Sequence, residues 1–326
     1  MAFAGRVLRL RLTPDLAAAI HLDAFARPPI DPATGAAASA VALTIDLWDA
    51  RSARLEAPEP GRTAQLVVGR NSATAGSARV TWEPPFVWGF DTATGHGHWY
   101  CDDPAALATL SRGQPFLRML HEWTQALGLR VLHGAAVGRH GRGILLTAPG
   151  GSGKSTLALA AQLAGWDYVG DDYVALEPAQ AGAGDGPDAA PRRPRVHGTY
   201  AVAKLVPDHM MARLPAIAAA RLAVSDGVKA LLAVPLTPLP DGLALAALVV
   251  PHIAPDGVTR RLPMSPGRAL TALAPSTLFQ LPGAGRADLA PLAALVRALP
   301  VWGLALGPDL GEALAVLGET LAEAAP

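Results

Sequence analysis

Apolar and polar positions alternate in short runs over the first hundred residues, and turn residues separate the runs. Apolar side chains at every second position are typical of half-buried strands, and Gly, Pro and Asp between them favour turns. We therefore expect a small β-rich domain over 1–110. Its tryptophans at 48, 82, 88 and 99 are interpreted as core or edge residues, and a peptide-docking surface is the alternative. The runs are RVLRLRL (6–12), AVALTIDLWD (40–49), AQLVVGR (64–70) and ARVTWEPPFVWGFD (78–91).

The pattern changes to helical spacing after Pro104. Apolar residues from Phe116 to Leu129 recur at intervals of three and four, which predicts a helix, and a domain junction is expected near 105–115. The second predicted domain, 111–326, mixes strands with helices, which makes its expected class α/β. Expected strands are 131–138, 144–148, 166–178, 228–236 and 245–253, and expected helices are 155–165, 266–275, 287–299 and 311–324. The Pro- and Gly-rich stretch 178–194 is predicted to be a mobile loop.

A glycine-rich turn, APGGSGKS at 148–155, connects a predicted strand to a predicted helix. This context favours a phosphate-binding P-loop, because backbone N–H groups and a helix N-terminus then surround an anion. Lys154 is expected to reach the β- and γ-phosphates, and the hydroxyl of Ser155 to bind Mg²⁺. Ala148 replaces the usual first Gly, but it lies where the strand ends. The predicted nucleotide-binding residues are Gly150, Gly151, Ser152, Gly153, Lys154, Ser155 and Thr156.

Two adjacent acids, Asp171 and Asp172, end the apolar run that follows the P-loop helix. Two carboxylates beside a metal allow one to bind Mg²⁺ while the other accepts a proton from a hydroxyl. We therefore predict both as metal-linked catalytic residues, without deciding which acid has which role. His133 lies on the strand before the loop, where the residues alone favour a packed core histidine.

These segments together resemble the nucleotide-binding core of the HPr kinase/phosphorylase family, which shares its fold with ATP-dependent phosphoenolpyruvate carboxykinases. The resemblance rests on LHGAAV, ILLTAPGGSGKSTLALAAQLAG and YVGDDYVAL, is strong over 131–176, and extends weakly over 116–326. It implies a P-loop kinase domain of this type with ATP and Mg²⁺ as cofactors. It also implies that His133 lies in the active site with the acid pair, and that Asp171 is the better candidate for the base or metal-linked acid.

The likeness continues in RVHGTYAVAKL at 195–205, which resembles HPr-kinase-like proteins that phosphorylate ribosomally made peptides. In that group Lys204 would direct its positive charge at the transferring phosphate, and a surface lysine on a helix is the alternative. The stretch 272–285 also resembles this wider group. Arg260 and Arg261 could bind phosphate, or simply end a charged strand. The glycine-rich signature of true HPr kinase/phosphorylases and its glutamate have no counterpart here, so neither HPr nor a phosphorylase reaction is predicted.

Composition limits the class of protein. The chain has 27 Lys and Arg against 27 Asp and Glu, which gives no overall field for binding nucleic acid or an anionic membrane. A single cysteine, Cys101, cannot form an internal disulfide, and no signal peptide or uncharged run long enough to span a membrane is apparent. We therefore expect a cytoplasmic protein without nucleic-acid or membrane partners.

The leading hypothesis is a kinase that transfers the γ-phosphoryl group of Mg-ATP to a hydroxyl, most simply a serine on a peptide or small protein. The predicted catalytic residues are His133, Lys154, Asp171, Asp172 and Lys204, and the predicted metal ligands are Ser155 and the two acids. The β-rich domain would help to bind the acceptor, and a homo-oligomer is possible because related kinases often form one. The alternatives are a small-molecule hydroxyl kinase on the same site and a nucleotide-sensing module that does not catalyse.

Overall fold

The computed structural model describes residues 1–25, 40–54, 65–67, 70–107, 113–179, 192–206, 213–214, 221–224, 229–281 and 286–324. It shows a mixed α/β protein, as predicted, with two large mixed sheets and, among these residues, seven α-helices. The predicted loop at 178–194 lies largely outside the described residues. No helix in the described part has the length and hydropathy needed to cross a membrane.

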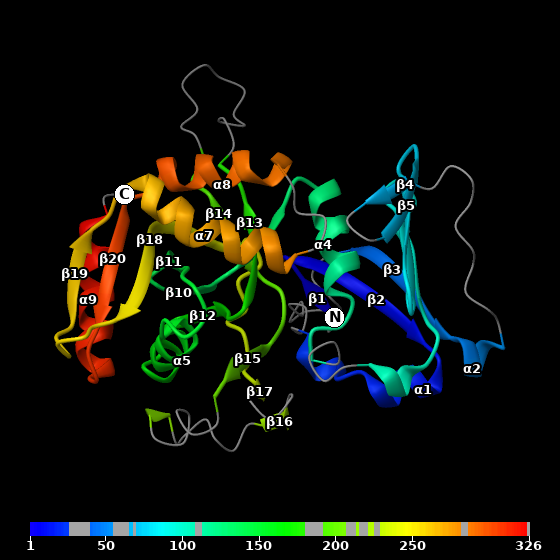
Figure 1. Ribbon diagram of the computed structural model, residues 1–326, viewed down its shortest axis with the longest axis horizontal. Helices are drawn as coiled ribbons and strands as arrows, with labels where there is room; N and C mark the ends of the chain where they lie inside the picture. Colours follow the sequence, from blue (N-terminus) through cyan, green and yellow to red (C-terminus); the bar gives the residue numbers. More distant parts are fainter. Residues whose placement is uncertain are drawn as a thin grey trace.

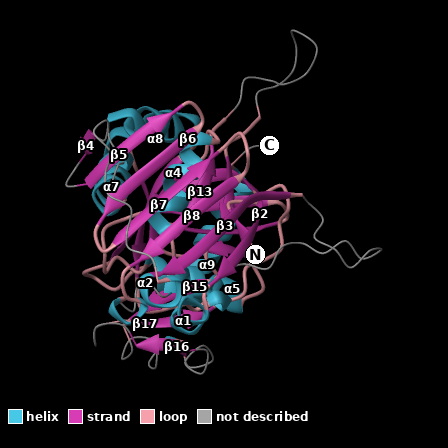
Figure 2. Cartoon of the chain, turned by 90° about the vertical axis from the view of Figure 1, so that its right-hand side faces the viewer, coloured by secondary structure: helices cyan, strands magenta, loops and turns pink. Residues whose placement is uncertain are grey.

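The first large sheet contains eight strands, all from the first 101 residues (Figure 1). The strands are β1 (Ala2–Phe3), β2 (Arg6–Leu12), β3 (Val41–Asp49), β4 (Gln65–Val67), β5 (Arg70–Ala75), β6 (Ala78–Glu83), β7 (Phe86–Asp91) and β8 (His96–Cys101). Their order is β1-β2-β3-β8-β7-β6-β5-β4, which Figure 2 shows nearly face on. Strands β2, β3 and β8 run parallel, and the other neighbours are antiparallel. The short helices α1 (Pro14–Ala19) and α2 (Ala50–Ala53) accompany this sheet.

The second large sheet has nine strands and carries helices on both faces (Figure 1). Its strands are β9 (Arg130–His133), β10 (Ala135–Arg139), β11 (Arg142–Leu146), β12 (Asp167–Gly170), β13 (Tyr173–Glu177), β14 (Arg195–Gly198), β18 (Leu243–Ile253), β19 (Arg260–Pro263) and β20 (Val301–Leu306). Side chains from α5 (Lys154–Leu163) and α9 (Leu310–Glu323) form one core with this sheet. Those from α7 (Pro266–Gln280) and α8 (Arg286–Ala298) form another. The two cores lie on opposite faces of the sheet because successive side chains of a strand point to opposite faces. Ile144 and Leu146 of β11 thus face the first core, and Leu145 faces the second.

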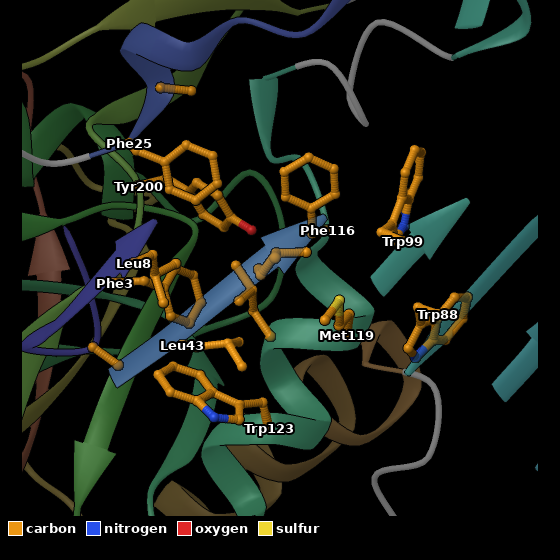
Figure 3. Packing of buried hydrophobic residues seen from close by; sticks show 14 of the residues in the cluster. Phe3, Leu8, Phe25, Leu43, Trp88, Trp99, Phe116, Met119, Trp123 and Tyr200 are labelled. Carbon is orange, nitrogen blue, oxygen red and sulfur yellow. The ribbon is translucent and has the colours of Figure 1, made fainter. Parts of the chain in front are cut away.

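A small antiparallel sheet of β15 (Val202–Leu205), β17 (Ala230–Ala233) and β16 (Arg221–Val224) lies beside α5. The predicted helix after residue 116 is α4 (Leu117–Ala126), which packs against β7 and β9 and so joins the two large sheets. Around it lies an aromatic cluster that combines residues of both predicted domains. Figure 3 shows Phe116 and Trp123 from the α4 region among Phe3 and Trp99 of the first sheet and Tyr200 of the second region.

Candidate active site

The loop at 148–155 connects β11 to α5, as the sequence predicts. Gly153 precedes the helix with a φ of +92°, a conformation that favours glycine, and a Cβ there would lie 2.7 Å from Leu306 Cδ1. Gly150 and Gly151 have nothing within 4 Å of the position a Cβ would take, so the outer side of the loop is open. The glycine-rich turn therefore leads into the N-terminus of α5, whose first backbone N–H groups have no partner within the helix.

Ala148 is fully buried and belongs to the core beneath α7 and α8, together with Leu145 and Val169. Its methyl group therefore fills the protein interior and does not enter the glycine-rich turn. The departure from Gly at this position is explained by packing.

Lys154 is buried, and its ammonium donates to the carbonyl oxygens of Ala148 at 2.6 Å and Pro149 at 3.1 Å. Burial lowers its pKa, while the charges of Asp171 and Asp172 act in the opposite direction. The ammonium is thus held against the loop, within the electrostatic reach of both acids. Thr156 follows in the first turn of α5 and is partly buried.

The acids lie at an interruption in a long antiparallel ribbon. His133 of β9 is paired with Tyr173 of β13, and Ala136 of β10 is paired with Gly170 of β12. The sequence-predicted strand 131–138 is therefore interrupted at Gly134, and the predicted strand 166–178 is interrupted at Asp171 and Asp172. A Cβ on Gly134 would lie 2.8 Å from the carbonyl oxygen of Leu146, which explains the glycine there.

On the other side of the break, Asp172 has a φ of +70°. This conformation is uncommon for a residue with a side chain, and here it turns two adjacent carboxyl groups to different partners. The carbonyl of Asp172 accepts from Gly134 N–H at 3.1 Å, which joins the two strands across the break.

Asp171 faces the P-loop. It is 1% exposed, and the hydroxyl of Ser155 donates to its Oδ1 at 2.9 Å. Burial raises the pKa of Asp171, the neighbouring charge of Asp172 adds to the rise, and the Ser155 hydrogen bond opposes it.

Asp172 faces away from the loop and is surrounded by donors. Its Oδ2 lies 2.6 Å from Lys204 Nζ, and its Oδ1 lies 3.2 Å from His133 Nε2. Burial alone would raise its pKa, but the charge of Lys204 and the contact with His133 hold the pKa well below its usual range. Asp172 is therefore the more acidic of the two carboxyl groups.

Lys204 lies on β15, which corrects the alternative of a surface lysine on a helix. Its backbone N–H is 3.5 Å from Asp171 Oδ2, and its ammonium lies 5.8 Å from the centre of the Tyr173 ring. The small sheet thus brings a cation to the acid pair from outside the P-loop and its neighbouring strands.

Three residues near the site were missed by the sequence reasoning. Gln114 hydrogen-bonds both Asp172 and Lys204, the hydroxyl of Thr277 in α7 accepts from His133 N–H at 3.2 Å, and Tyr173 packs edge-on against the His133 ring. Thr277 lies in the stretch 272–285 that carries the weak resemblance. Gln114 has no local signal, because a single glutamine in a turn matches no motif.

The structure brings His133, Lys154, Ser155, Asp171, Asp172 and Lys204 together. Arg260 and Arg261 are engaged elsewhere, with Asp256 and Glu323 respectively, and Arg261 stacks on Trp302. No group of three or more His, Cys, Asp or Glu that could hold a metal occurs among the described residues. The Asp171 carboxylate and the Ser155 hydroxyl still suit Mg²⁺, which keeps several waters and takes further oxygens from phosphates, whereas Asp172, predicted as a third ligand, is bonded by His133, Lys204 and Gln114.

Comparison of the sequence with models of known protein families finds no match, and comparison with curated proteins finds none either.

Proposed function

We propose that the protein is a Mg²⁺- and ATP-dependent kinase that transfers the γ-phosphoryl group to a hydroxyl. The main support for this proposal is that four charged or polar groups from different elements meet at the break that contains the acid pair. A P-loop lysine and serine lie on one side of an acid pair, and a histidine and a second lysine lie on the other. Phosphoryl transfer depends mainly on positioning and on neutralising charge, and these groups supply both.

The loop side would hold the nucleotide. The glycine-rich turn and the start of α5 would form the anion-binding site, and Lys154 can turn from the loop carbonyls to phosphate oxygens. Ser155 and Asp171 would hold Mg²⁺, which when bound neutralises charge on the phosphates. The buried carboxylate of Asp171, which has no ion pair in the described residues, supports this assignment.

The far side would hold the acceptor. Asp172 is ionised and oriented by His133 and Lys204, so it can accept a hydrogen bond from a hydroxyl that approaches the γ-phosphate. Its low pKa makes it a weak base, but a loose transition state needs little proton transfer before the phosphoryl group moves. Lys204 would stabilise the charge of the transferring group.

The finer fold assignment belongs to the same proposal. Helices on both faces of the nine-stranded sheet, with the P-loop after one of its parallel strands, support a kinase domain of the HPr kinase and phosphoenolpyruvate carboxykinase type. The acceptor we propose is a serine on a peptide or small protein, and the eight-stranded sheet would help to bind it.

The test is transfer of γ-labelled phosphate from ATP in the presence of Mg²⁺ to panels of serine peptides and small hydroxyl compounds. Asp171→Asn and Asp172→Asn should each lower transfer by about 10²-fold or more, since each removes a charge that the transition state uses. Asp167→Asn, at the far end of β12, is the matched control and should keep wild-type activity.

The outcomes separate the alternatives. Full transfer by both Asn variants would contradict the mechanism. Label on a small hydroxyl compound and on no peptide would identify a small-molecule kinase. ATP binding without label on any acceptor would favour a nucleotide-sensing module.

A further inference from the structure

Gln114 lies in the turn before α4, far in sequence from the P-loop, yet its side chain is buried at the acid pair. Its amide nitrogen donates to Asp172 Oδ2 at 2.8 Å, and its amide oxygen accepts from Lys204 Nζ at 2.6 Å. The same Nζ and Oδ2 atoms lie 2.6 Å apart, so the three side chains close a triangle. We propose that Gln114 is a positioning residue that aims the ammonium of Lys204 at the transferring phosphoryl group.

The chemistry of the triangle favours an amide. Lys offers only donors and an ionised Asp only acceptors, so a side chain that bonds both must donate with one end and accept with the other. Glutamate would place a second negative charge beside Asp172, and an apolar side chain would satisfy neither group. The orientation of the Gln114 amide follows directly from its two partners.

The triangle also determines how many N–H groups of the Lys204 ammonium are left for a ligand. An ammonium has three N–H groups, and here one is used by Asp172 and one by Gln114. No third acceptor for this nitrogen occurs among the described residues. With two bonds fixing the nitrogen, the third N–H has a defined direction and is available for a phosphate oxygen. Without Gln114, the ammonium could rotate about a single contact with Asp172.

The backbone around Gln114 is anchored on both sides. A Cβ on Gly113 would lie 2.5 Å from Leu231 Cδ1, so this segment packs closely on β17. The hydroxyl of Tyr200 donates to the carbonyl of Pro115 at 2.6 Å. Phe116 packs between Phe25 and Trp99, with ring centroids 6.2 and 5.1 Å away (Figure 3). The aromatic cluster at the junction of the two large sheets therefore fixes the position of Gln114.

The test uses Gln114→Met, which keeps the length of the side chain and removes both hydrogen bonds. Gln162→Met, on a partly exposed position of α5, is the matched control. The first readout is the rate at which an amine-acetylating reagent labels Lys204, measured by peptide mass spectrometry. The second is kcat and the KM for ATP in phosphate transfer, which rests on the proposed function, whereas the labelling does not.

Gln114→Met should raise Lys204 labelling roughly 10-fold and lower kcat roughly 10-fold, as expected for loss of a hydrogen bond to a charged group, with the KM for ATP unchanged. Gln114→Asn, one methylene shorter, should behave in the same direction while keeping a polar side chain. A thermal midpoint equal to that of wild type separates positioning from misfolding.

Labelling and kcat at wild-type levels in both folded variants would overturn the proposal. Faster labelling in the variants, combined with a wild-type protein that phosphorylates no acceptor, would show that Gln114 holds the Lys204 ammonium but would overturn both the kinase function and its direction at a phosphoryl group. A raised KM for ATP with unchanged kcat would assign Gln114 to nucleotide binding and contradict the role proposed here.

Discussion

The two large sheets differ in what fills their interiors. The nine-stranded sheet is covered by small and aliphatic side chains, mostly Ala, Leu and Val, with Trp166, Tyr168 and the partly buried Trp302 as the aromatic exceptions. The core of the eight-stranded sheet is aromatic, and it extends past α4 to Tyr173 and Tyr200 of the other region. The aliphatic layers support the sheet that carries the P-loop and the acids. The aromatic cluster packs against His133 through Tyr173 and holds the turn that contains Gln114 through Phe116.

The contrast in core composition accompanies a difference in role between the two sheets. The predicted catalytic groups come from the nine-stranded sheet, its P-loop and the small sheet, and the eight-stranded sheet contributes none of them. Besides the acceptor binding proposed for it, this sheet supports the site through Trp99, which packs against Phe116 at the start of α4. Substitutions on the two sides should therefore have different signatures.

The largest effect is expected for Lys154→Met. Transfer of phosphate should fall about 10²- to 10³-fold, because a charge directed at the phosphates is removed. Folding should be unaffected or slightly improved, since burial of the ammonium is unfavourable. Phosphate-transfer rates and thermal unfolding measure the two quantities. Near-normal transfer would show that the loop does not hold the reacting phosphates.

Phe116→Ala should have the opposite pattern, in which the main loss is in stability. The buried ring contacts Phe25 and Trp99, so its loss should cost about 3 kcal/mol of unfolding free energy, measured by denaturant titration. Lys204 should also become easier to label, because Gln114 loses its anchor. Phe86→Ala, on a half-buried ring at the other side of Trp99, is the control and should leave the labelling unchanged. Equal labelling in both variants would break the link between the aromatic cluster and the site.

Tyr200→Phe changes the same aromatic cluster and should have a smaller effect on stability. It removes the hydrogen bond to the Pro115 carbonyl and should cost about 1 kcal/mol. The control is Tyr168→Phe, whose buried hydroxyl has no hydrogen-bond partner among the described residues, so its removal should not destabilise the protein. Denaturant titration of both variants provides the measurement, and a larger loss for Tyr168→Phe would contradict the assignment.

The smallest effect concerns pH and His197 of β14, which lies where the two large sheets meet, since the Ala4 N–H donates to the neighbouring Gly198 carbonyl at 2.8 Å. Burial lowers the pKa of His197 below its ordinary value of 6.5, against the opposing effect of Glu177. The unfolded chain then binds a proton more readily than the folded one, so stability falls as pH drops below about 6.5. His197→Gln should make this fall shallower by less than about 1 kcal/mol between pH 6.5 and 5. The exposed His96→Gln is the control, and identical pH profiles for wild type and His197→Gln would contradict the prediction.

Local patterns predicted most of the secondary structure and most of the residues at the site. The loop at 148–155, the acid pair and the strands beside them carry signals within short windows, so their positions could be read directly. The break in the ribbon could not, because Gly134 and the acids interrupt two strands whose pairing is a long-range property. Gln114 was missed for the same reason, since its role arises only when α4 and β15 meet. The parallel arrangement of β2, β3 and β8 likewise has no signature in alternating residues.

The interrupted ribbon also limits how the chain can change in length. The pairs His133–Tyr173 and Ala136–Gly170 leave two residues between them in each strand, and the register shifts by one directly after Ala136. Inserting one residue beside Gly134 would shift β9 by one position against β13 and turn its side chains to the opposite face. His133 would then point away from Asp172 even though every residue of the site was still present. Substitutions at the site are therefore expected to be tolerated better than insertions or deletions between His133 and Ala136.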